Sequence, residues 1–280
     1  MPNSTTDRRV VDHSGGVVHV AQLTDTHLGR EPGSTLLSMD TDRSLQAVVD
    51  LVRSRARPVD LVLGTGDLAD GGTLNAYQRL HGYFSQLSDN CFCLPGNHDD
   101  RQLMVEALGA FPWLAAEVRI ANWQVLLLDS QVPGQVGGTL GAAELERLGH
   151  CLDLARTEGL FTLVCLHHHP VPIGSGWLDE QIVTDREQFF STLDRFSGVR
   201  GVLWGHVHQE IDRERNGVRL MASPSTCVQF APGSEHFRAD DRAPGYRWLE
   251  LHPDGRIATG VERVEGMHFE VDLESDGYLD

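Results

Sequence analysis

Five short clusters of residues that commonly bind metals, spread from residue 25 to residue 208, constrain this chain more than any other feature. Each cluster follows an apolar run typical of a β-strand. The clusters are Asp25-Thr26-His27, Gly66-Asp67, Gly96-Asn97-His98-Asp99, His168-His169-Pro170 and Gly205-His206-Val207-His208. Side chains at strand ends can converge on one edge of a sheet. Mixed oxygen and nitrogen ligands without thiolates favour two divalent transition metals over one structural zinc.

Hydrophobic periodicity predicts alternating strands and helices up to residue 208. The predicted strands cover residues 17–23, 60–63, 90–94, 124–128, 160–166 and 201–204, and the predicted helices cover 44–52, 74–87, 142–155 and 185–196. After residue 208, four runs at 218–222, 227–230, 247–251 and 257–264 predict antiparallel strands. Pro253-Asp254-Gly255 is a turn signal between the last two. These patterns favour one α/β domain with two sheets.

The ends of the chain differ in composition from its middle. We expect a disordered leader over residues 1–16, a folded domain over 17–264 and a solvated acidic tail over 265–280. The leader is polar and lacks the apolar region of a signal peptide, and no apolar run approaches the length of a membrane span. We therefore expect a cytoplasmic protein without membrane contact. The sequence does not fix the oligomeric state, and a homodimer is allowed.

The charge of the chain limits its partners. The formal net charge is −17, and no block of lysine or arginine is present. A long polyanion such as DNA or RNA would be repelled, which argues against a nucleic-acid partner. A small anion with one phosphate could still enter a site that carries two divalent cations. The charge pattern therefore favours a small-molecule substrate.

Local spacing indicates how the clusters could bind metals. Asp25 and His27 are two residues apart, so in an extended segment both side chains leave on the same side. His206 and His208 repeat this spacing. Asp67 directly follows a buried strand, where its carboxylate could bridge two metals or cap the helix that begins near Thr73.

The remaining clusters add a neutral ligand and a choice among histidines. Asn97 offers an amide oxygen that holds a metal without adding charge, and the adjacent His98 would point away from it towards substrate. The three successive histidines at 167–169 cannot all point the same way on a strand, because side chains alternate between its faces.

In this order, the clusters resemble the signature of the calcineurin-like metallophosphoesterase superfamily, which is D-x-H, GD, GNH[DE], H-x-P and GHxH. The resemblance covers residues from about 18 to 225. It implies a two-sheet β-sandwich flanked by helices, in an αββα arrangement. It also implies a pair of divalent metal ions, for which we expect iron or manganese, although zinc or cobalt would suit the same ligands.

The resemblance also implies a role for each matching residue. Its metal ligands would be Asp25, His27, Asp67, Asn97, His168, His206 and His208, with Asp67 as the bridge. The H-x-P spacing selects His168, and His167 or His169 takes that place if the strand register differs. Substrate would contact His27, Asp67, Asn97, His98 and His208. His98 would be the catalytic residue that protonates the leaving oxygen.

Further segments resemble the bacterial class III 3',5'-cyclic AMP phosphodiesterases, namely residues 24–28, 33–37, 166–170, 176–179 and 204–210. This resemblance implies hydrolysis of cyclic AMP to 5'-AMP by a metal-bridged hydroxide. One alternative is a phosphodiesterase that acts on glycerophosphodiesters or other small diesters. Another is a metal-dependent binding module without catalysis, which the intact set of ligands and His98 disfavours.

Overall fold

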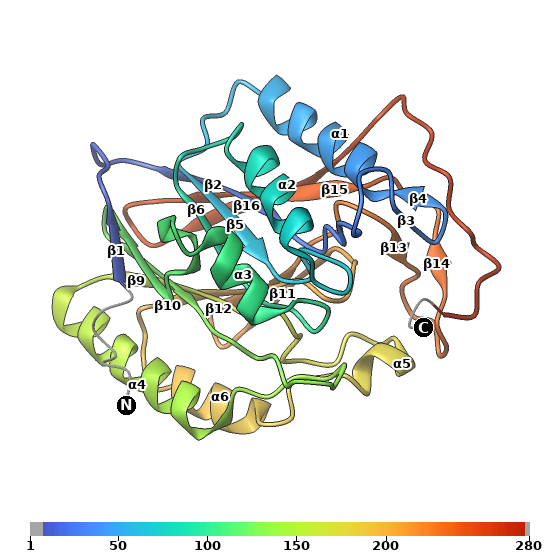
Figure 1. The fold of residues 1–280 in the computed structure, drawn as a ribbon. Helices are drawn as coiled ribbons and strands as arrows, with labels where there is room; N and C mark the ends of the chain where they lie inside the picture. The colour runs from blue at the N-terminus through green and yellow to red at the C-terminus, as the bar shows by residue number, and fades with distance from the viewer. Residues whose placement is uncertain (1–7, 278–280) are drawn as a thin grey trace.

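Two large β-sheets lie face to face in this protein, and helices cover their outer sides (Figure 1). The structure is a computed structural model of the 280-residue chain, and it describes residues 8–277. The first sheet has the order β1-β7-β8-β9-β10-β12-β11. Its strands are β1 (Arg8–Val11), β7 (Glu117–Ile120), β8 (Trp123–Leu127), β9 (Phe161–Cys165), β10 (Val199–Trp204), β11 (Ile211–Arg215) and β12 (Val218–Ala222).

The second large sheet has the order β16-β15-β2-β5-β6. Its strands are β2 (Val18–Leu23), β5 (Leu61–Thr65), β6 (Cys91–Leu94), β15 (Gly245–Leu251) and β16 (Ile257–Arg263). Strands β2, β5 and β6 run parallel, whereas β15 pairs antiparallel with both β2 and β16. Two small hairpins form separate two-stranded sheets, β3 (Thr35–Leu36) with β4 (Met39–Asp40) and β13 (Gln229–Phe230) with β14 (Ala239–Asp240).

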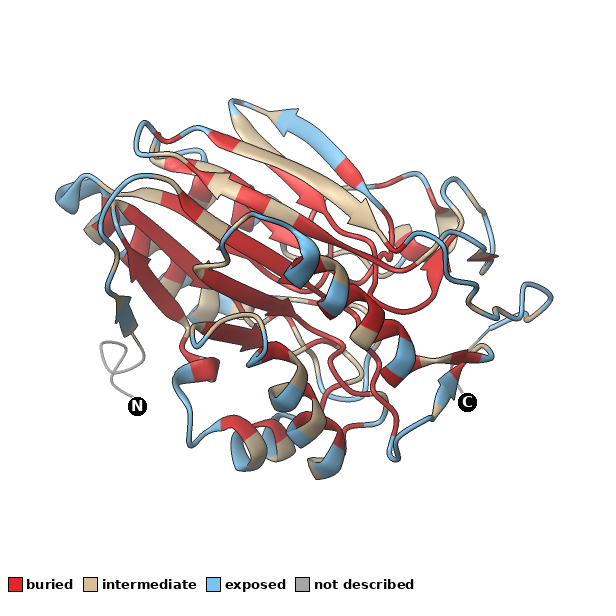
Figure 2. Ribbon diagram, turned by 90° about the horizontal axis from the view of Figure 1, so that it is seen from above, coloured by how far each residue is buried: buried red, intermediate tan, exposed pale blue. Residues whose placement is uncertain are grey.

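Alternation along the strands sorts their side chains between the layers. Leu61 and Leu63 of β5 enter the core between the two sheets, while Val62 packs with the helices outside. Leu163 and Val164 of β9 divide in the same way. Because successive side chains point to opposite faces, a strand covered on both sides is apolar throughout. Figure 2 shows the result, with buried residues along the central strands.

Helices occupy the two outer layers. The five-stranded sheet packs against α1 (Thr41–Ser54), α2 (Leu74–Phe84) and α3 (Arg101–Leu108), and the seven-stranded sheet packs against α4 (Gly141–Glu158) and α6 (Arg186–Leu193). A short helix, α5 (Gly176–Asp179), and a 3-10 turn at Pro112–Leu114 lie in connecting segments. The predicted αββα sandwich is therefore confirmed, and so is the hairpin between β15 and β16.

The chain ends differ from the expected leader and tail. Residues 1–7 and 278–280 lie outside the described residues, but β1 pairs in parallel with β7, so residues 8–11 are part of the sheet. In the acidic tail, Phe269 and Val271 pack against buried side chains, and the backbone N–H of Asp272 donates to the carbonyl of Leu37 at 2.9 Å. The tail is thus partly packed on the β3–β4 hairpin rather than fully solvated.

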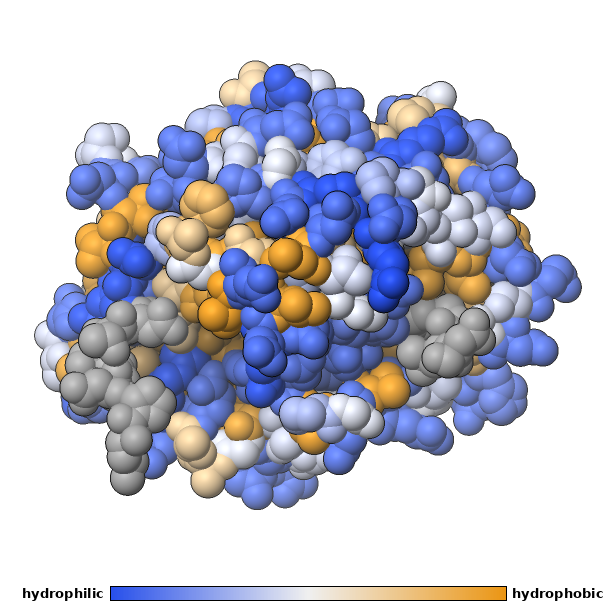
Figure 3. All heavy atoms as spheres, in the orientation of Figure 1, coloured by the Kyte–Doolittle hydropathy of each residue, from blue (hydrophilic) through white to orange (hydrophobic). Residues whose placement is uncertain are grey.

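Hydrophilic side chains predominate on the face drawn in Figure 3, with apolar ones scattered among them. Within residues 8–277, the exposed large apolar residues are Val10, Val105, Phe111, Met267 and Leu273. Within residues 8–277, no helix combines the length and the apolar character needed to cross a membrane.

Candidate metal centre

The five sequence clusters meet where the carboxyl ends of parallel strands from both sheets come together. Strands β2, β5 and β6 carry the first three clusters, and β9 and β10 carry the other two. A backbone hydrogen bond joins two neighbouring loops: the N–H of Asp25 donates to the carbonyl of Gly66 at 3.0 Å. The N–H of His206 donates to Oδ1 of Asp25 at 2.9 Å, which links the two sheets. The loops therefore form one assembly.

Glycines in these motifs make room for the neighbouring ligand side chains. A Cβ atom at Gly66 would lie 2.4 Å from Nδ1 of His167, and one at Gly96 would lie 2.2 Å from Oδ1 of Asp67. Both distances are far below van der Waals contact. Gly66 also has a φ of +94°, which glycine adopts without steric cost. Side chains at either position would separate the loops.

The ligand loops hold strained backbone. Of the nine described non-glycine residues with positive φ, five are predicted ligands: Asp25, His27, Asp67, His206 and His208. A left-handed conformation costs such a residue about 1–2 kcal/mol and persists only where its surroundings enforce it. Concentration of this strain in one group of side chains indicates a functional site.

One group of potential ligands consists of Asp25, His27 and His208, whose ligand atoms lie within 4.8 Å of one another. Nε2 of His208 lies 3.3 Å from Nε2 of His27 and 3.4 Å from Oδ1 of Asp25. Nδ1 of His208 lies 2.7 Å from the carbonyl oxygen of Val228, so it carries the proton and donates it. This leaves Nε2 as the nitrogen directed at the other two ligands, as a metal ligand requires.

A second group forms around Asp67. Nε2 of His167 lies 3.2 Å from both Oδ2 of Asp67 and Oδ1 of Asn97. Nδ1 of His167 donates to the carbonyl of Thr65 at 2.8 Å, which turns Nε2 towards the group. His206 is buried beside them, and its Nε2 atom has no hydrogen-bond partner among residues 8–277. A buried imidazole nitrogen without a partner is costly unless a ligand satisfies it.

His168 occupies a different environment from His167. Its ring nitrogens lie near those of His167 and His206, but both already have protein partners. Nδ1 lies 2.8 Å from the hydroxyl of Ser130, and Nε2 lies 3.0 Å from the carbonyl of Val136. The H-x-P spacing predicts His168 as a ligand, but among the three histidines it is His167 that directs a nitrogen at Asp67 and Asn97, so the geometry favours the alternative in which His167 is the ligand.

The donor set fits two divalent cations. Asp67 lies between the two groups, because its Oδ2 atom is 3.9 Å from Nε2 of His27 and 3.2 Å from Nε2 of His167. Carboxylate, amide and imidazole ligands suit iron, manganese, zinc or cobalt. The helix-capping alternative for Asp67 is wrong, because Thr73 caps α2 by accepting from the N–H of Ala76. Asp67 instead accepts from the N–H of His98 at 2.9 Å.

His98 lies at the edge of these groups, with its ring centroid 4.8 Å from that of His27. Its Nδ1 atom is 3.0 Å from Oδ1 of Asp70. The aspartate fixes the ring and favours its protonated form. His98 is thus placed beside both groups without being required as a ligand in either.

In the metal-free site, the negative charge of Asp67 and the imidazoles of His98 and His167 shift one another's pKa values. Burial alone would raise the pKa of Asp67, but the imidazoles of His167 and His98 outweigh it and hold the pKa well below its usual range. In return, Asp67 overcomes the effect of burial on both histidines and raises the pKa of each to about 9. Burial and the neighbouring histidines lower the pKa of His206, which stays neutral. Two protonated imidazoles thus supply positive charge in the metal-free protein.

We expect metal binding to weaken as the pH falls. His167 must lose its proton to bind a metal, and its pKa of about 9 means that the deprotonated fraction falls with each pH unit below that value. The Kd for the metal bound by the group around Asp67 and His167 should therefore rise about tenfold for each pH unit between pH 8 and pH 6. Calorimetry in two buffers with different protonation enthalpies should detect release of about one proton. A Kd that is constant over this range would contradict the assignment of His167.

Asp99 joins the loops that carry Asp67 and Asn97. Its carboxylate accepts from the backbone N–H groups of Leu68, Ala69 and Gly96 at 2.9–3.1 Å and from the hydroxyl of Tyr77 at 2.9 Å. Asp99 is buried, so these bonds are shielded from water. The sequence pointed to Asp99 through its place in the Gly96-Asn97-His98-Asp99 cluster, but it gave no indication that Tyr77 contributes to the site. Asp99 therefore fixes the distance between the two loops.

Replacing Asp99 with alanine should destabilise the metal-free protein by about 3 kcal/mol, because it leaves several buried donors without an acceptor. Asp99→Asn keeps one acceptor oxygen and should cost less, about 1 kcal/mol. Urea unfolding of both variants measures the difference in the free energy of unfolding. Asp100→Ala is not a suitable control, because the side chain of Asp100 caps helix α3. Asp153→Ala on the surface of α4 is a suitable control. Equal stability of Asp99→Ala and the parent protein would contradict this role.

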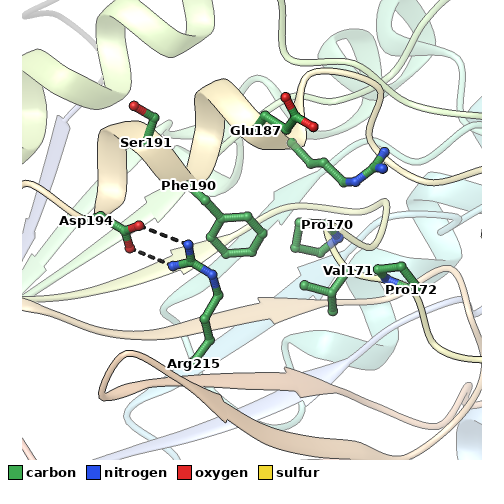
Figure 4. Close-up of a pocket in the computed structure, with 9 residues that line it drawn as sticks. Pro170, Val171, Pro172, Glu187, Phe190, Ser191, Asp194 and Arg215 are labelled. Carbon is green, nitrogen blue, oxygen red and sulfur yellow. Dashed lines mark hydrogen bonds and ion pairs between the residues drawn. The ribbon is translucent and has the colours of Figure 1, made fainter.

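A surface pocket beside the 167–169 segment is distinct from the metal centre (Figure 4). Its volume is about 520 Å³, and Pro170, Val171, Pro172 and helix α6 line it. Arg215 on its floor lies over Phe190 and donates two hydrogen bonds to Asp194, at 2.6 and 2.9 Å. The carboxylate of Asp194 therefore already balances the charge of the Arg215 guanidinium. None of the predicted ligands lines the pocket, so the chemistry belongs to the metal centre.

Comparison with known sequences identifies similar proteins over almost the whole chain. A sequence model of calcineurin-like phosphoesterases matches residues 18–210. A 3',5'-cyclic adenosine monophosphate phosphodiesterase, CpdA, from Pseudomonas aeruginosa is 46% identical over 93% of this chain and 95% of its own length. CpdA from Escherichia coli strain K12 is 42% identical over the same shares. A 3',5'-cyclic-nucleotide phosphodiesterase from Nostoc is 36% identical over 88% of this chain and 92% of its own.

Solved structures share the fold at much lower identity. A dimetal phosphatase from Danio rerio aligns with a TM-score of 0.61 at 16% identity, over 90% of this chain and 100% of that chain. Purple acid phosphatase PPD1 from yellow lupin aligns with a TM-score of 0.62 at 12% identity, over 91% of this chain and 53% of that chain. These two alignments confirm the architecture described above.

Proposed function

We infer that this chain, which belongs to the calcineurin-like phosphoesterase family, is a metal-dependent 3',5'-cyclic AMP phosphodiesterase. Three relatives with this printed activity are 41–46% identical to it over 93% of the chain. The observation that carries the inference is the convergence of two ligand groups on one shared carboxylate, Asp67, with the imidazole of His98 beside them. The reaction we propose is hydrolysis of the cyclic diester to 5'-AMP.

For the first metal we propose Asp25, His27, Asp67 and His208 as ligands, and for the second Asp67, Asn97, His167 and His206. Iron or manganese is the pair that we expect, because these ligands bind either metal and availability decides between them. When bound, the two cations would supply an activated water and positive charge against the phosphoryl oxygens. The ligands themselves are held in place before any metal binds, by the bonds among their loops.

The side chains around the metals would bind the substrate and move one proton. We propose that His27, Asp67, Asn97, His98 and His208 surround the phosphate. Hydrolysis forms a new P–O bond from water and breaks the bond from phosphorus to the 3'-oxygen. His98 donates a proton to that oxygen as it leaves. Because Nδ1 of His98 is held by Asp70, the proton that it transfers is the one on Nε2.

A comparison of substrates tests this proposal. The protein reconstituted with Mn²⁺ should hydrolyse cyclic AMP with a kcat/KM at least about tenfold above that for glycerophosphocholine, since the site must recognise more than a phosphodiester. Cyclic GMP measures the contribution of the base. The product should be 5'-AMP, without 3'-AMP. Faster hydrolysis of glycerophosphocholine than of cyclic AMP would favour a general small-diester phosphodiesterase instead.

A further inference from the structure

His206 is packed among the rings of three successive histidines. The ring centroids of His167, His168 and His169 lie 5.1, 4.8 and 5.7 Å from that of His206. We call these three side chains the imidazole cage. All three are fully buried. The direction of the partnerless Nε2 atom of His206 therefore depends on how the cage holds the ring.

His168 is the member of the cage whose orientation is fixed by partners outside the two ligand groups. A carbonyl oxygen can only accept, so Nε2 of His168 carries the ring proton and donates it to Val136 at 3.0 Å. Nδ1 is then the acceptor, and the hydroxyl of Ser130 donates to it at 2.8 Å. The two partners determine both the rotamer and the tautomer of the ring. They also leave no nitrogen of His168 for a metal.

Close packing from the same loop reinforces this orientation. A Cβ atom at Gly138 would lie 2.4 Å from Nδ1 of His168 and 2.5 Å from its Cγ atom, so the backbone lies directly against the ring. The loop is itself anchored, because the N–H of Thr139 donates to the carbonyl of Ser130 at 3.0 Å. The N–H of Thr184 donates to the carbonyl of Gly138 at 2.9 Å. The segment 130–138 thus holds His168 from two sides.

His169 contacts His206 in a different way. Its ring lies nearly parallel to that of His206, with an interplanar angle of 19°. Neither of its ring nitrogens has a hydrogen-bond partner within the described part of the chain. Nε2 lies 3.7 Å from Oδ1 of Asp179, which already accepts the N–H of Ile173. Packing is therefore the contribution of His169, whereas His168 links the cage by directional hydrogen bonds to the segment 130–138.

We propose that His168 is a positioning residue for the second metal site. The segment 130–138 holds His168 through Ser130 and Val136, and His168 holds the ring of His206 with Nε2 directed into the site. Partners of this kind, which touch a ligand but not the metal, commonly change metal affinity 10- to 100-fold. This inference rests on the proposed function, because it takes His206 as a metal ligand.

Ser130→Ala tests the proposal while keeping His168 itself. Full-length metal-free protein is titrated with Mn²⁺ by calorimetry, and the paired ions are detected by electron paramagnetic resonance. We expect one Mn²⁺ to bind within about twofold of the parent affinity and the other to bind about 10- to 100-fold more weakly. At saturating Mn²⁺, kcat should recover to within about threefold, since the ligands are all present. A merely structural role would not weaken one site selectively.

Ser44→Ala is the matched control, because Ser44 is equally buried and donates one hydrogen bond, to the carbonyl of Thr41, in helix α1. It should leave both Mn²⁺ affinities unchanged. Gly138→Ala is a second test variant, which displaces the ring of His168 and should weaken the same Mn²⁺ site.

Equal Mn²⁺ affinities in Ser130→Ala, Gly138→Ala and the parent protein would overturn the proposal. Equal weakening of both sites would overturn it as well, since it would indicate a general loss of structure. The titration needs no substrate, so a failure to hydrolyse cyclic AMP would contradict the proposed function without changing the affinities expected here.

Discussion

Replacing His98 with alanine should lower kcat for cyclic AMP about 10²- to 10⁴-fold, while both metal ions stay bound. The imidazole is the proton donor that we propose for the leaving 3'-oxygen, and Asp67 and Asp70 keep it protonated in the metal-free protein by raising its pKa to about 9. Its loss removes general-acid catalysis but none of the proposed ligands. Steady-state kinetics together with metal analysis of the same sample measure both effects.

The control for this experiment is His150→Ala, which removes an exposed histidine of helix α4 and should have no effect on kcat. The kcat of Asp70→Asn should lie between those of His98→Ala and His150→Ala, because this change weakens the hydrogen bond that orients His98 without removing the ring. A His98→Ala variant that retains more than about a tenth of the parent kcat would exclude His98 as the acid. Loss of metal from this variant would instead make it a ligand.

The second large effect should separate His167 from His168. His167→Ala should lose one of two metal ions and about 10³-fold in kcat/KM, since a metal contributes several kcal/mol of transition-state stabilisation. His168→Ala should still bind two ions at saturating Mn²⁺ and keep most of kcat. The reason is that both nitrogens of His168 are bonded to Ser130 and Val136 rather than directed at Asp67.

Elemental analysis after dialysis against Mn²⁺ and measurement of kcat/KM for both variants decide this assignment. Loss of a metal ion from His168→Ala, with retention of both by His167→Ala, would restore the assignment that the H-x-P spacing predicts. Both side chains are buried in the same segment, so circular dichroism must first show that each variant is folded.

The order of strands and ligands could be predicted from the sequence because each ligand cluster ends a strand of the sandwich. Buried parallel strands are apolar throughout, so runs such as β5 and β10 are visible as patterns, and the polar residues after them mark the sheet edge. Carboxyl ends of parallel strands share an edge. Convergence of Asp25 and Asp67 follows from that topology, whereas His206 reaches them from the other sheet.

Strands with buried charges were not predicted. Strand β7 alternates Glu117 and Arg119 with apolar residues, which is the pattern of a strand with one solvated face. In the structure both charged side chains are buried and form an ion pair, and Gln124 also donates to Glu117. Such pairing depends on neighbouring strands. Local patterns do not contain it.

The sequence leaves the choice among the three histidines open for a related reason. Strand β9 ends at Cys165, so the alternation of a strand does not extend through residues 167–169. Which imidazole faces the metals depends on Ser130 and Val136, more than thirty residues away, because they take both nitrogens of His168. Spacing to Pro170 carries no information about those partners.

Hydrolysis of cyclic AMP by this chain should require two bound metal ions, and a titration of activity with metal measures this requirement. Metal-free full-length protein receives increasing Mn²⁺ at fixed cyclic AMP, while bound Mn²⁺ and released 5'-AMP are measured together. We predict negligible turnover without metal and full turnover only when about two ions are bound. Full activity without metal, or no turnover with two ions bound, would exclude a two-metal cyclic AMP phosphodiesterase.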